Sequence, residues 1–282
     1  MTTDSIPPTL FKYAAPARAS QLLGALRIRF SQVSVLNDAD EFQPPYKGVA
    51  TRADIEKQVV ERFRLKHPKE FAQVYEVLPK EKAEKFIQEM VPEWADRVEA
   101  NYEKSVQGVY ERLDSNFGIL SLSETATSRL MWSFYSDGGR GLVIEFDSND
   151  PWFNAKKASD DSFRHLHKVK YVEDREPDYL LTTKDEDLLY TKATEWEFEK
   201  EWRIIRNFND ACDIVGKDSI GKDVLLFAIP PEAIKSVIFG YRATPDLEAA
   251  LRNIIASNPQ LKHVNVKRAF REANGHIEIV PA

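Results

Sequence analysis

Four glutamates at alternate positions are the first feature of this sequence that could carry chemistry. They lie in KATEWEFEKEWRII (Lys192 to Ile205). If the chain is extended from Glu199 onward, Glu199, Glu201 and Arg203 project from one face of a strand. In a cleft, one of these glutamates can orient a hydroxyl or stabilise positive charge while the other glutamate tunes it. The alternative is an edge strand whose charges face water or pair with Arg203.

A second group of polar and aromatic residues lies in LSLSETATSRLMWSFYSDGGRGLVIEF. Ser121 and Ser123 alternate out of an apolar strand, and Trp132 and Tyr135 are three residues apart on one predicted helix. Arg140 sits in a glycine-rich turn that leads into a strand, which is neither a Walker loop nor a Rossmann fingerprint. Taken alone, such a turn is more typical of a hairpin connection, and the two aromatics are more typical of a core.

The segment SVLNDADEF carries a third group, Asn37, Asp38 and Glu41. These side chains suit the capping of a following turn or helix. They would also bring amide and carboxylate groups to a pocket. A magnesium-dependent nuclease using Asp38, Glu41 and Glu199 is a further alternative, although no spacing in the sequence indicates one coordination sphere.

Motifs of other enzyme classes are absent from the sequence. His165 and His167 form an HxH pair without a further ligand at a familiar spacing, so we predict no metal site. The sequence has no GxSxG, HExxH or GxxxxGK[ST] motif. Its one cysteine, Cys212, has no histidine nearby in sequence and is interpreted as a structural thiol.

The bulk composition indicates a folded globular chain. The 282 residues are 43% hydrophobic and 11% aromatic, with a net charge of -6 that argues against a general nucleic-acid coat. The start, MTTDSIPPTLFKY, lacks the pattern of a secretion signal, and no apolar stretch approaches the roughly 20 residues of a membrane helix. We therefore expect a soluble cytoplasmic protein that has no membrane partner, and the composition disfavours a nucleic-acid partner without ruling it out.

The elements that must position these residues are helices and strands without a regular βαβ repeat. Residues 51–115 are rich in Glu, Lys, Gln and Ala, and apolar residues recur there at helical spacing. We predict three or four helices in this stretch, separated at Pro68, Pro79 and Pro92. The sequence thus predicts one α+β domain spanning 1–282, with a mixed, mostly antiparallel sheet and a helical insertion at about 51–115.

Outside the insertion, the expected elements follow from period-two and apolar patterns. We expect a helix from Pro16 to Leu26, another over Asp185 to Glu195 and a third over Pro245 to Ser257. The expected strands are Leu10–Tyr13, Arg27–Phe30, Phe117–Ser123, Gly141–Asp147, Lys168–Val172, the stretch around Glu199–Ile205, Val224–Ile229, Ser236–Gly240 and two closing segments, HVNVKRAF and HIEIV.

Five motifs occur in order along the chain: LFKY, LND with a Glu close behind, FGILSLSE, LMWSFYSDGGRGLVIEFD and KATEWEFEKEWR. Together they resemble a bacterial family of domains of unknown function, family 2971, whose members carry LND..E, MW..Y....G..I.F and W..E.E.R patterns. The resemblance covers most of the chain. This sequence has Leu122–Ser123 where many relatives have Phe-Ser. The family implies no activity.

More distantly, the order of residues is similar to that of ADP-ribosyltransferases. In those enzymes a residue on an early strand, a Ser or Tyr on a middle strand and a Glu within ExE on a late strand surround NAD. The matching positions here are Tyr13 or Arg29, then Ser121 or Ser123, then Glu199 and Glu201. The chain departs from the pattern at its first position, where Lys12–Tyr13 replaces the usual Arg or His.

This second resemblance implies NAD as a substrate and nucleotide-type ligand, with the acceptor open and a bacterial toxin or defence system as one setting. Glu201 would stabilise the oxocarbenium ion, Glu199 would polarise the acceptor and Ser123 would order the site. The expected NAD-binding residues are Tyr13, Arg29, Asn37, Asp38, Trp132, Tyr135, Arg140 and Arg203. In this set Trp132 or Tyr135 would stack on nicotinamide and Arg29 or Arg140 would hold pyrophosphate. The rival hypothesis is a non-catalytic ligand- or protein-binding regulatory module in which the glutamates and Arg203 form an internal ion network.

Overall fold

The computed structural model describes residues 5–38, 41–159, 161–211 and 213–282, so the prediction for Cys212 lies outside the described residues. The chain forms two compact units. The first comprises Met1–Glu41, Leu113–Asp174 and Leu189–Ala282, and the second comprises Phe42–Arg112 and Arg175–Leu188. None of the described helices is both long enough and apolar enough to cross a membrane.

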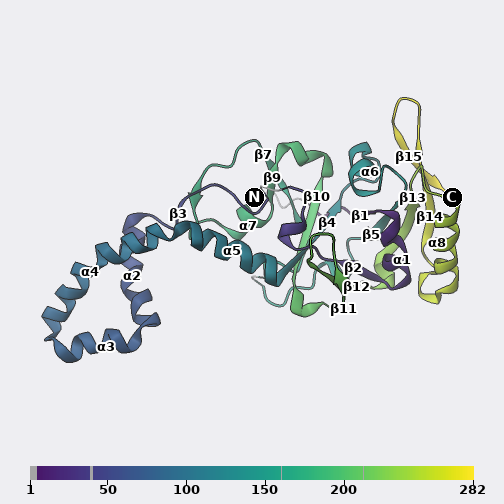
Figure 1. The fold of residues 1–282 in the computed structure, drawn as a ribbon. Coiled ribbons are helices and arrows are strands. Elements are labelled where there is room, and N and C mark those ends of the chain that lie inside the picture. Colours follow the sequence, from purple (N-terminus) through teal and green to yellow (C-terminus); the bar gives the residue numbers. More distant parts are fainter. Residues whose placement is uncertain (1–4, 39–40, 160, 212) are drawn as a thin grey trace. The chain divides into compact units, whose positions relative to one another are not determined.

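An eight-stranded mixed sheet forms the centre of the first unit (Figure 1). Its spatial order is β15-β14-β13-β5-β1-β4-β10-β6, and every neighbouring pair is antiparallel except β13 with β14. The predicted α+β class, with a mostly antiparallel sheet, is confirmed. The strands are β1 (Thr9–Ala14), β4 (Phe117–Ser123), β5 (Leu142–Asp147), β6 (His167–Lys168), β10 (Glu201–Asn207), β13 (Ile234–Phe239), β14 (Asn265–Arg271) and β15 (Ile277–Pro281).

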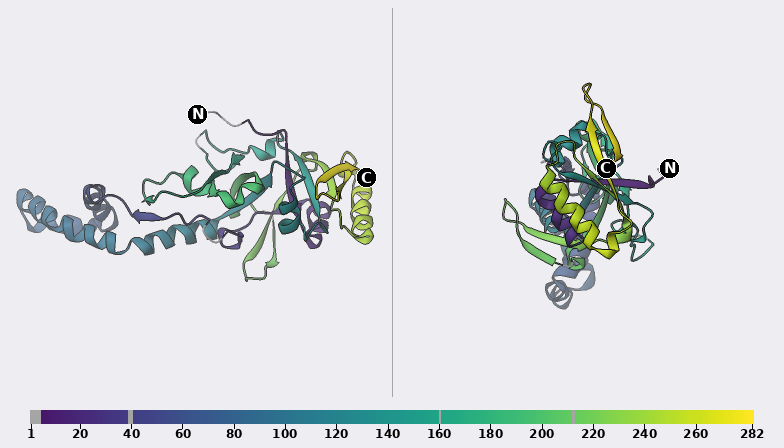
Figure 2. Two further views of the ribbon diagram at one scale, coloured as in Figure 1. Left: turned by 90° about the horizontal axis from the view of Figure 1, so that it is seen from above. Right: turned by 90° about the vertical axis from the view of Figure 1, so that its right-hand side faces the viewer.

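Helices and smaller sheets complete the first unit. α1 (Pro16–Gly24) and α8 (Pro245–Ser257) lie side by side, as Figure 2 shows. The short helix α6 (Arg129–Tyr135) begins at Ser128, whose hydroxyl accepts a hydrogen bond from the Met131 amide. The remaining strands are β2 (Arg27–Arg29), β11 (Asp213–Lys217) and β12 (Asp223–Ala228) in one three-stranded sheet, and β7 (Lys170–Val172) parallel to β9 (Thr191–Ala193).

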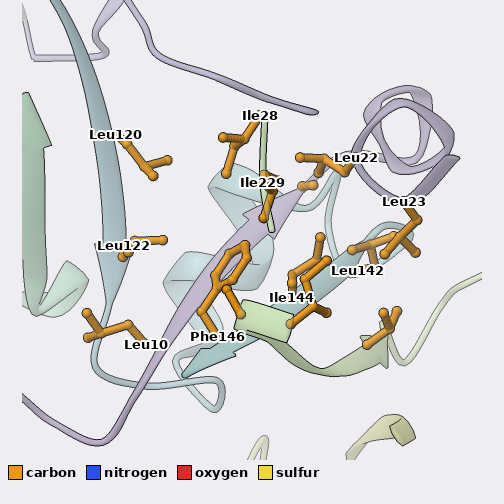
Figure 3. Close-up of a cluster of buried hydrophobic side chains, with 14 of the residues drawn as sticks. Leu10, Leu22, Leu23, Ile28, Leu120, Leu122, Leu142, Ile144, Phe146 and Ile229 are labelled. Atoms are coloured by element: carbon orange, nitrogen blue, oxygen red, sulfur yellow. The ribbon is translucent and has the colours of Figure 1, made fainter. Parts of the chain in front are cut away.

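One face of the eight-stranded sheet is apolar because alternate residues of its strands point to the same side. Figure 3 shows Leu10, Leu120, Leu122, Ile144 and Phe146 from this face among the core side chains. Leu22 and Leu23 of α1, Leu251 of α8 and Phe227 of β12 pack in the same cluster. Each of these larger side chains contributes about 1.5–3 kcal/mol when fully buried. The opposite face of β4 and β10 carries the polar residues of the site.

The second unit contains the helical insertion. α2 (Arg52–Lys66) is separated from α3 (Pro68–Val77) and α4 (Lys80–Ala100) near Pro68 and Pro79, as predicted, and α5 (Tyr102–Asn116) leads back to β4. A short pair, β3 (Tyr46–Gly48) and β8 (Asp178–Tyr179), is parallel. The predicted break at Pro92 is wrong, since α4 continues through it. Ile55 of α2 packs against Ala95 of α4. This contact holds the turn after Pro92 in the helical conformation.

The segment before the glutamates also differs from its prediction. Instead of one helix over Asp185 to Glu195, the chain forms α7 (Asp185–Leu189), then β9, then the 3₁₀ helix η3 (Thr194–Glu199). The predicted helix start at Asp185 is correct, because the acidic first turn of α7 suits a helix N-terminus. β9 has only three residues, and an alternation of apolar and polar residues over so short a segment cannot be distinguished from a helical pattern.

Candidate functional site

Polar residues from distant parts of the chain meet around one pocket in the first unit. The pocket has a volume of about 210 Å³. Its walls come from β1, the segment after β2, β4, α6, β9, η3 and β10. The polar and charged residues that line it are Lys12, Tyr13, Ser31, Asn37, Glu41, Ser121, Ser123, Tyr135, Lys192, Glu199, Glu201 and Arg203.

The two central glutamates reach the pocket by different routes. Glu201 begins β10, whereas Glu199 ends η3, so the prediction of a continuous strand from Glu199 is wrong. Lys200 between them adopts a left-handed conformation with φ 46° and ψ 55°. This turn lets residues two apart face the same pocket even though only one of them is in the strand. β10 lies between β4 and β6, so the edge-strand alternative is also wrong.

Arg203 joins two of the pocket's carboxylates. Its Nε donates to Glu201 Oε1 at 2.6 Å and its Nη2 donates to Glu201 Oε2 at 2.8 Å, a bidentate pair. Nη2 also donates to Glu41, and Nη1 donates to the Leu189 carbonyl at 2.9 Å. The Arg203 side chain is only 1% exposed. Burial lowers the pKa of Arg203 to about 9. This value is still above neutral pH, so Arg203 remains cationic there.

Lys192 is the second cation of this network. Its Nζ lies 2.8 Å from Glu199 Oε2, 3.5 Å from Glu41 Oε2 and 3.8 Å from Glu201 Oε2. The ammonium group also lies 4.5 Å from the ring centroid of Trp196. Lys192 and Arg203 together therefore contact all three pocket carboxylates, and this pairing reduces the cost of burying them.

Tyr135 connects the network to the Asn37 segment. Its hydroxyl donates to Glu199 Oε1, and it accepts a hydrogen bond from Asn37 Nδ2 at 2.5 Å. Burial and the neighbouring Glu199 raise the pKa of Tyr135 well above its ordinary value, so it stays a neutral donor. Asn37 is exposed and Tyr135 is half-buried, so this chain of hydrogen bonds runs from the surface to a buried carboxylate.

The two serines of β4 have different partners. Ser123 pairs with Glu201 and Ser121 pairs with Arg203 across the β4–β10 ladder. The Ser123 hydroxyl donates to the Glu199 carbonyl at 2.6 Å and accepts from the Thr125 amide at 3.2 Å, so it holds the backbone at the end of η3. A hydrogen bond from Ser121 acts on the Glu201 carboxylate.

Two pocket groups have pKa values moved toward neutrality. Burial raises the pKa of Glu201 to about 7, against the opposing effect of Lys192. Desolvation lowers the pKa of Lys12 to about 8, against the opposing effect of Glu201. A carboxylate and an amine that titrate near neutral pH in one pocket are typical of functional sites.

Seven of the predicted site residues line this pocket: Glu199, Glu201, Ser123, Tyr13, Asn37, Tyr135 and Arg203. The other four lie outside its lining. Arg29 pairs with Asp218 at 2.6 Å, and Arg140 is exposed and contacts Asp137. Trp132 is fully buried against Tyr13 and donates to the Ala126 carbonyl at 2.7 Å, which places it in the core. Asp38 is half-buried, and its charge acts on Arg203.

Lys12 and Lys192 are pocket residues that the sequence analysis missed. Lys12 interrupts the apolar side of β1, between Leu10 and Ala14, and a charge at such a position is a usable signal. Lys192 opens the same KATEWEFEKEWR stretch that drew attention to the glutamates. Among the described residues, no three His, Cys, Asp or Glu side chains are grouped so as to hold a metal ion.

One family comparison bears on this region of the chain. Residues 131–204 match the model of a family described as "Protein of unknown function (DUF2971)". The match supports the resemblance inferred from the motifs over this stretch, which contains Tyr135, Lys192, Glu199, Glu201 and Arg203. No curated protein and no solved structure matches the chain.

Proposed function

We propose that the pocket binds NAD as a substrate and transfers its ADP-ribosyl group by glycosyl transfer. The observation that carries the proposal is the convergence of Glu199 and Glu201 on one pocket, with Tyr135 and Ser121 hydrogen-bonded to them. Two carboxylates held in a fixed place can stabilise positive charge that develops on a ribose next to them more strongly than they stabilise the uncharged ribose of the ground state.

The chemistry follows from the charge that develops on the ribose. The glycosidic C–N bond breaks with its electron pair going to the nicotinamide nitrogen, and the ribose carbon gains oxocarbenium character. The carboxylate of Glu201 accepts a hydrogen bond from a ribose hydroxyl and so stabilises the cation. The acceptor oxygen or nitrogen then bonds to that carbon and loses its proton, with Glu199 polarising the acceptor. With water as the acceptor, the products are nicotinamide, ADP-ribose and a proton.

A second candidate is ligand binding without chemistry. The observation that favours it is the bidentate contact of Arg203 with both oxygens of Glu201. A carboxylate held in this way has fewer lone pairs for a substrate, and the ion network then serves to shape the pocket. From the sequence, a glutamate-lined pocket and an internal ion network were alternatives. In the structure they occur together, because the glutamates face one pocket and are also paired with cations.

Release of nicotinamide from labelled NAD separates the two candidates. The wild-type chain is expected to release nicotinamide, and Glu201→Gln to reduce the rate at least about 100-fold because it removes the negative charge. Glu199→Gln is expected to reduce transfer to an added acceptor more than it reduces hydrolysis. Glu232→Gln, which changes an exposed carboxylate outside the pocket, is the matched control. NAD that binds without any nicotinamide release would favour the binding module.

A further inference from the structure

Lys12 differs from the other two cations of the pocket in its partners. Its Nζ donates to the Ser121 carbonyl at 2.9 Å, and among the described residues no carboxylate lies within ion-pair distance of it. An ammonium group has three N–H donors. The described residues therefore supply a hydrogen-bond acceptor for one N–H donor of Lys12, and the other two N–H donors can bind another partner.

The position of Lys12 follows from the way β1 meets β4. β1 pairs with β5 at six register positions but with β4 at only one, Phe11 with Ser123. The Lys12 side chain starts on the apolar side of β1 with Leu10 and Ala14, yet it lines the pocket and reaches the Ser121 carbonyl of β4. The sparse pairing of the two strands leaves this carbonyl available to hold the ammonium group at the pocket.

The charges of the pocket are distributed unevenly. Lys192 and Arg203 contact Glu41, Glu199 and Glu201, so the contact network has three acidic and two basic groups. Lys12 stands outside this network and is influenced by the positive charge of Arg18 as well as by the two glutamates Glu199 and Glu201. One side of the pocket thus has excess negative charge when its carboxylates are ionised, and the Lys12 side is positive.

We propose that Lys12 forms a phosphate subsite, so that the pocket selects a ligand with a phosphate at Lys12 and a cationic or cation-forming group at Glu199 and Glu201. The identification of that ligand as NAD rests on the proposed function, in which the phosphate is the one next to the nicotinamide ribose. Lys12 lines the pocket, whereas Arg29 and Arg140, the arginines that the sequence suggested for pyrophosphate, lie outside the pocket lining.

Nicotinamide mononucleotide and nicotinamide riboside provide the test because they differ only by a phosphate. Calorimetric titration at pH 7 is expected to show the mononucleotide binding the wild-type chain at least about tenfold more tightly. Lys12→Met is expected to remove this preference, and Lys12→Arg to keep most of it. Lys262→Met, which removes an exposed lysine outside the pocket, is expected to change neither affinity.

A second measurement keeps the test informative if Lys12→Met does not fold. The wild-type preference for the mononucleotide is expected to fall several-fold between pH 7 and pH 9, as the ammonium group near Arg18, Glu199 and Glu201 loses its proton. Equal affinity for the two ligands at pH 7, or no binding of either, overturns the subsite. A preference unchanged in a folded Lys12→Met also overturns it.

These outcomes are distinct from failure of the proposed function. A preference that depends on Lys12 without cleavage of NAD supports the phosphate subsite and contradicts glycosyl transfer. Cleavage of NAD by a Lys12→Met variant that keeps the full phosphate preference supports glycosyl transfer and contradicts the subsite.

Discussion

Arg203 holds both carboxylate oxygens of Glu201, two residues earlier on the same strand, through hydrogen bonds of 2.6 and 2.8 Å. The same guanidinium also donates to Glu41, which comes from the segment after β2. Residues from two distant parts of the chain are therefore fixed by one buried cation. Arg203 acts on the site by positioning the carboxylates, and its Nε, Nη1 and Nη2 atoms all donate to protein acceptors. It is therefore a poor candidate for binding pyrophosphate.

Replacing Arg203 by Met is expected to destabilise the first unit strongly. The change leaves Glu41 and Glu201 buried without their main partner, and breaking a buried ion pair in this way costs about 3–5 kcal/mol. Urea denaturation measures the loss. Arg97→Met removes an exposed pair with Glu93 on α4 and is expected to cost less than about 1 kcal/mol. Similar losses for the two variants would contradict the structural importance of the Arg203 network.

Replacing Tyr135 by Phe tests the hydrogen-bond chain from Asn37 to Glu199. The variant lacks the donor to Glu199 and the acceptor for Asn37 Nδ2. Because one partner is a charged group, we expect a loss of about 1–3 kcal/mol in the free energy of unfolding, together with weaker NAD binding. Tyr75→Phe, on α3 with a partly exposed ring, is the control. A Tyr135→Phe variant as stable as wild type would show that the chain contributes little.

The pH dependence of nicotinamide release is expected to be bell-shaped, with its maximum between pH 7 and 8. Glu201 must be ionised to stabilise the cation, and its raised pKa of about 7 sets the acidic limb. Lys12 must be protonated to hold the phosphate, and its lowered pKa of about 8 sets the basic limb.

Measurement of kcat/KM from pH 5.5 to 9.5 checks both limbs. Lys12→Arg is expected to shift the basic limb to higher pH, because a guanidinium holds its proton more strongly than an ammonium group. A basic limb that stays at about pH 8 in this variant would assign it to another group. A profile that is flat between pH 5.5 and 7 would contradict the role of Glu201.

Replacing Gly141 by Ala tests the close packing of β1 against the junction between the glycine-rich turn and β5. A Cβ at this position would lie 2.0 Å from the Ala14 carbonyl oxygen, and the backbone of β1 would have to move. Gly141→Ala is expected to cost about 3 kcal/mol or more in thermal or chemical denaturation. Gly108→Ala, inside α5 with ordinary contacts around its Cβ, is expected to stabilise by up to about 1 kcal/mol. A neutral Gly141→Ala variant would show that β1 and β5 separate easily.

Much of the fold could be predicted because its signals are local. The strand predicted at Leu10–Tyr13 lies within β1, and the predicted helix over Pro245–Ser257 has the bounds of α8. Pro68 and Pro79 end helices as their missing N–H groups require. Pro92 does not, because the packing of α2 against α4 outweighs one lost hydrogen bond, and no local pattern reports that packing.

The site was predicted less completely because it depends on contacts between distant residues. The residue types at Asn37, Ser123 and Glu201 indicated polar groups that meet at one pocket, and the structure places all three in its lining. The left-handed Lys200 has no sequence signal, since glycine is the usual residue there. The pairing of Arg29 with Asp218, 189 residues later, was equally invisible in the sequence.

Calorimetric titration of NAD into the wild-type chain, Glu201→Gln and Lys12→Met tests most directly whether the acidic and basic sides of the pocket bind one ligand. We expect saturable binding of one NAD per chain, and we expect each substitution to weaken it at least about tenfold while both variants keep the wild-type fold. NAD that does not bind the wild-type chain, or that binds all three proteins equally, would contradict it.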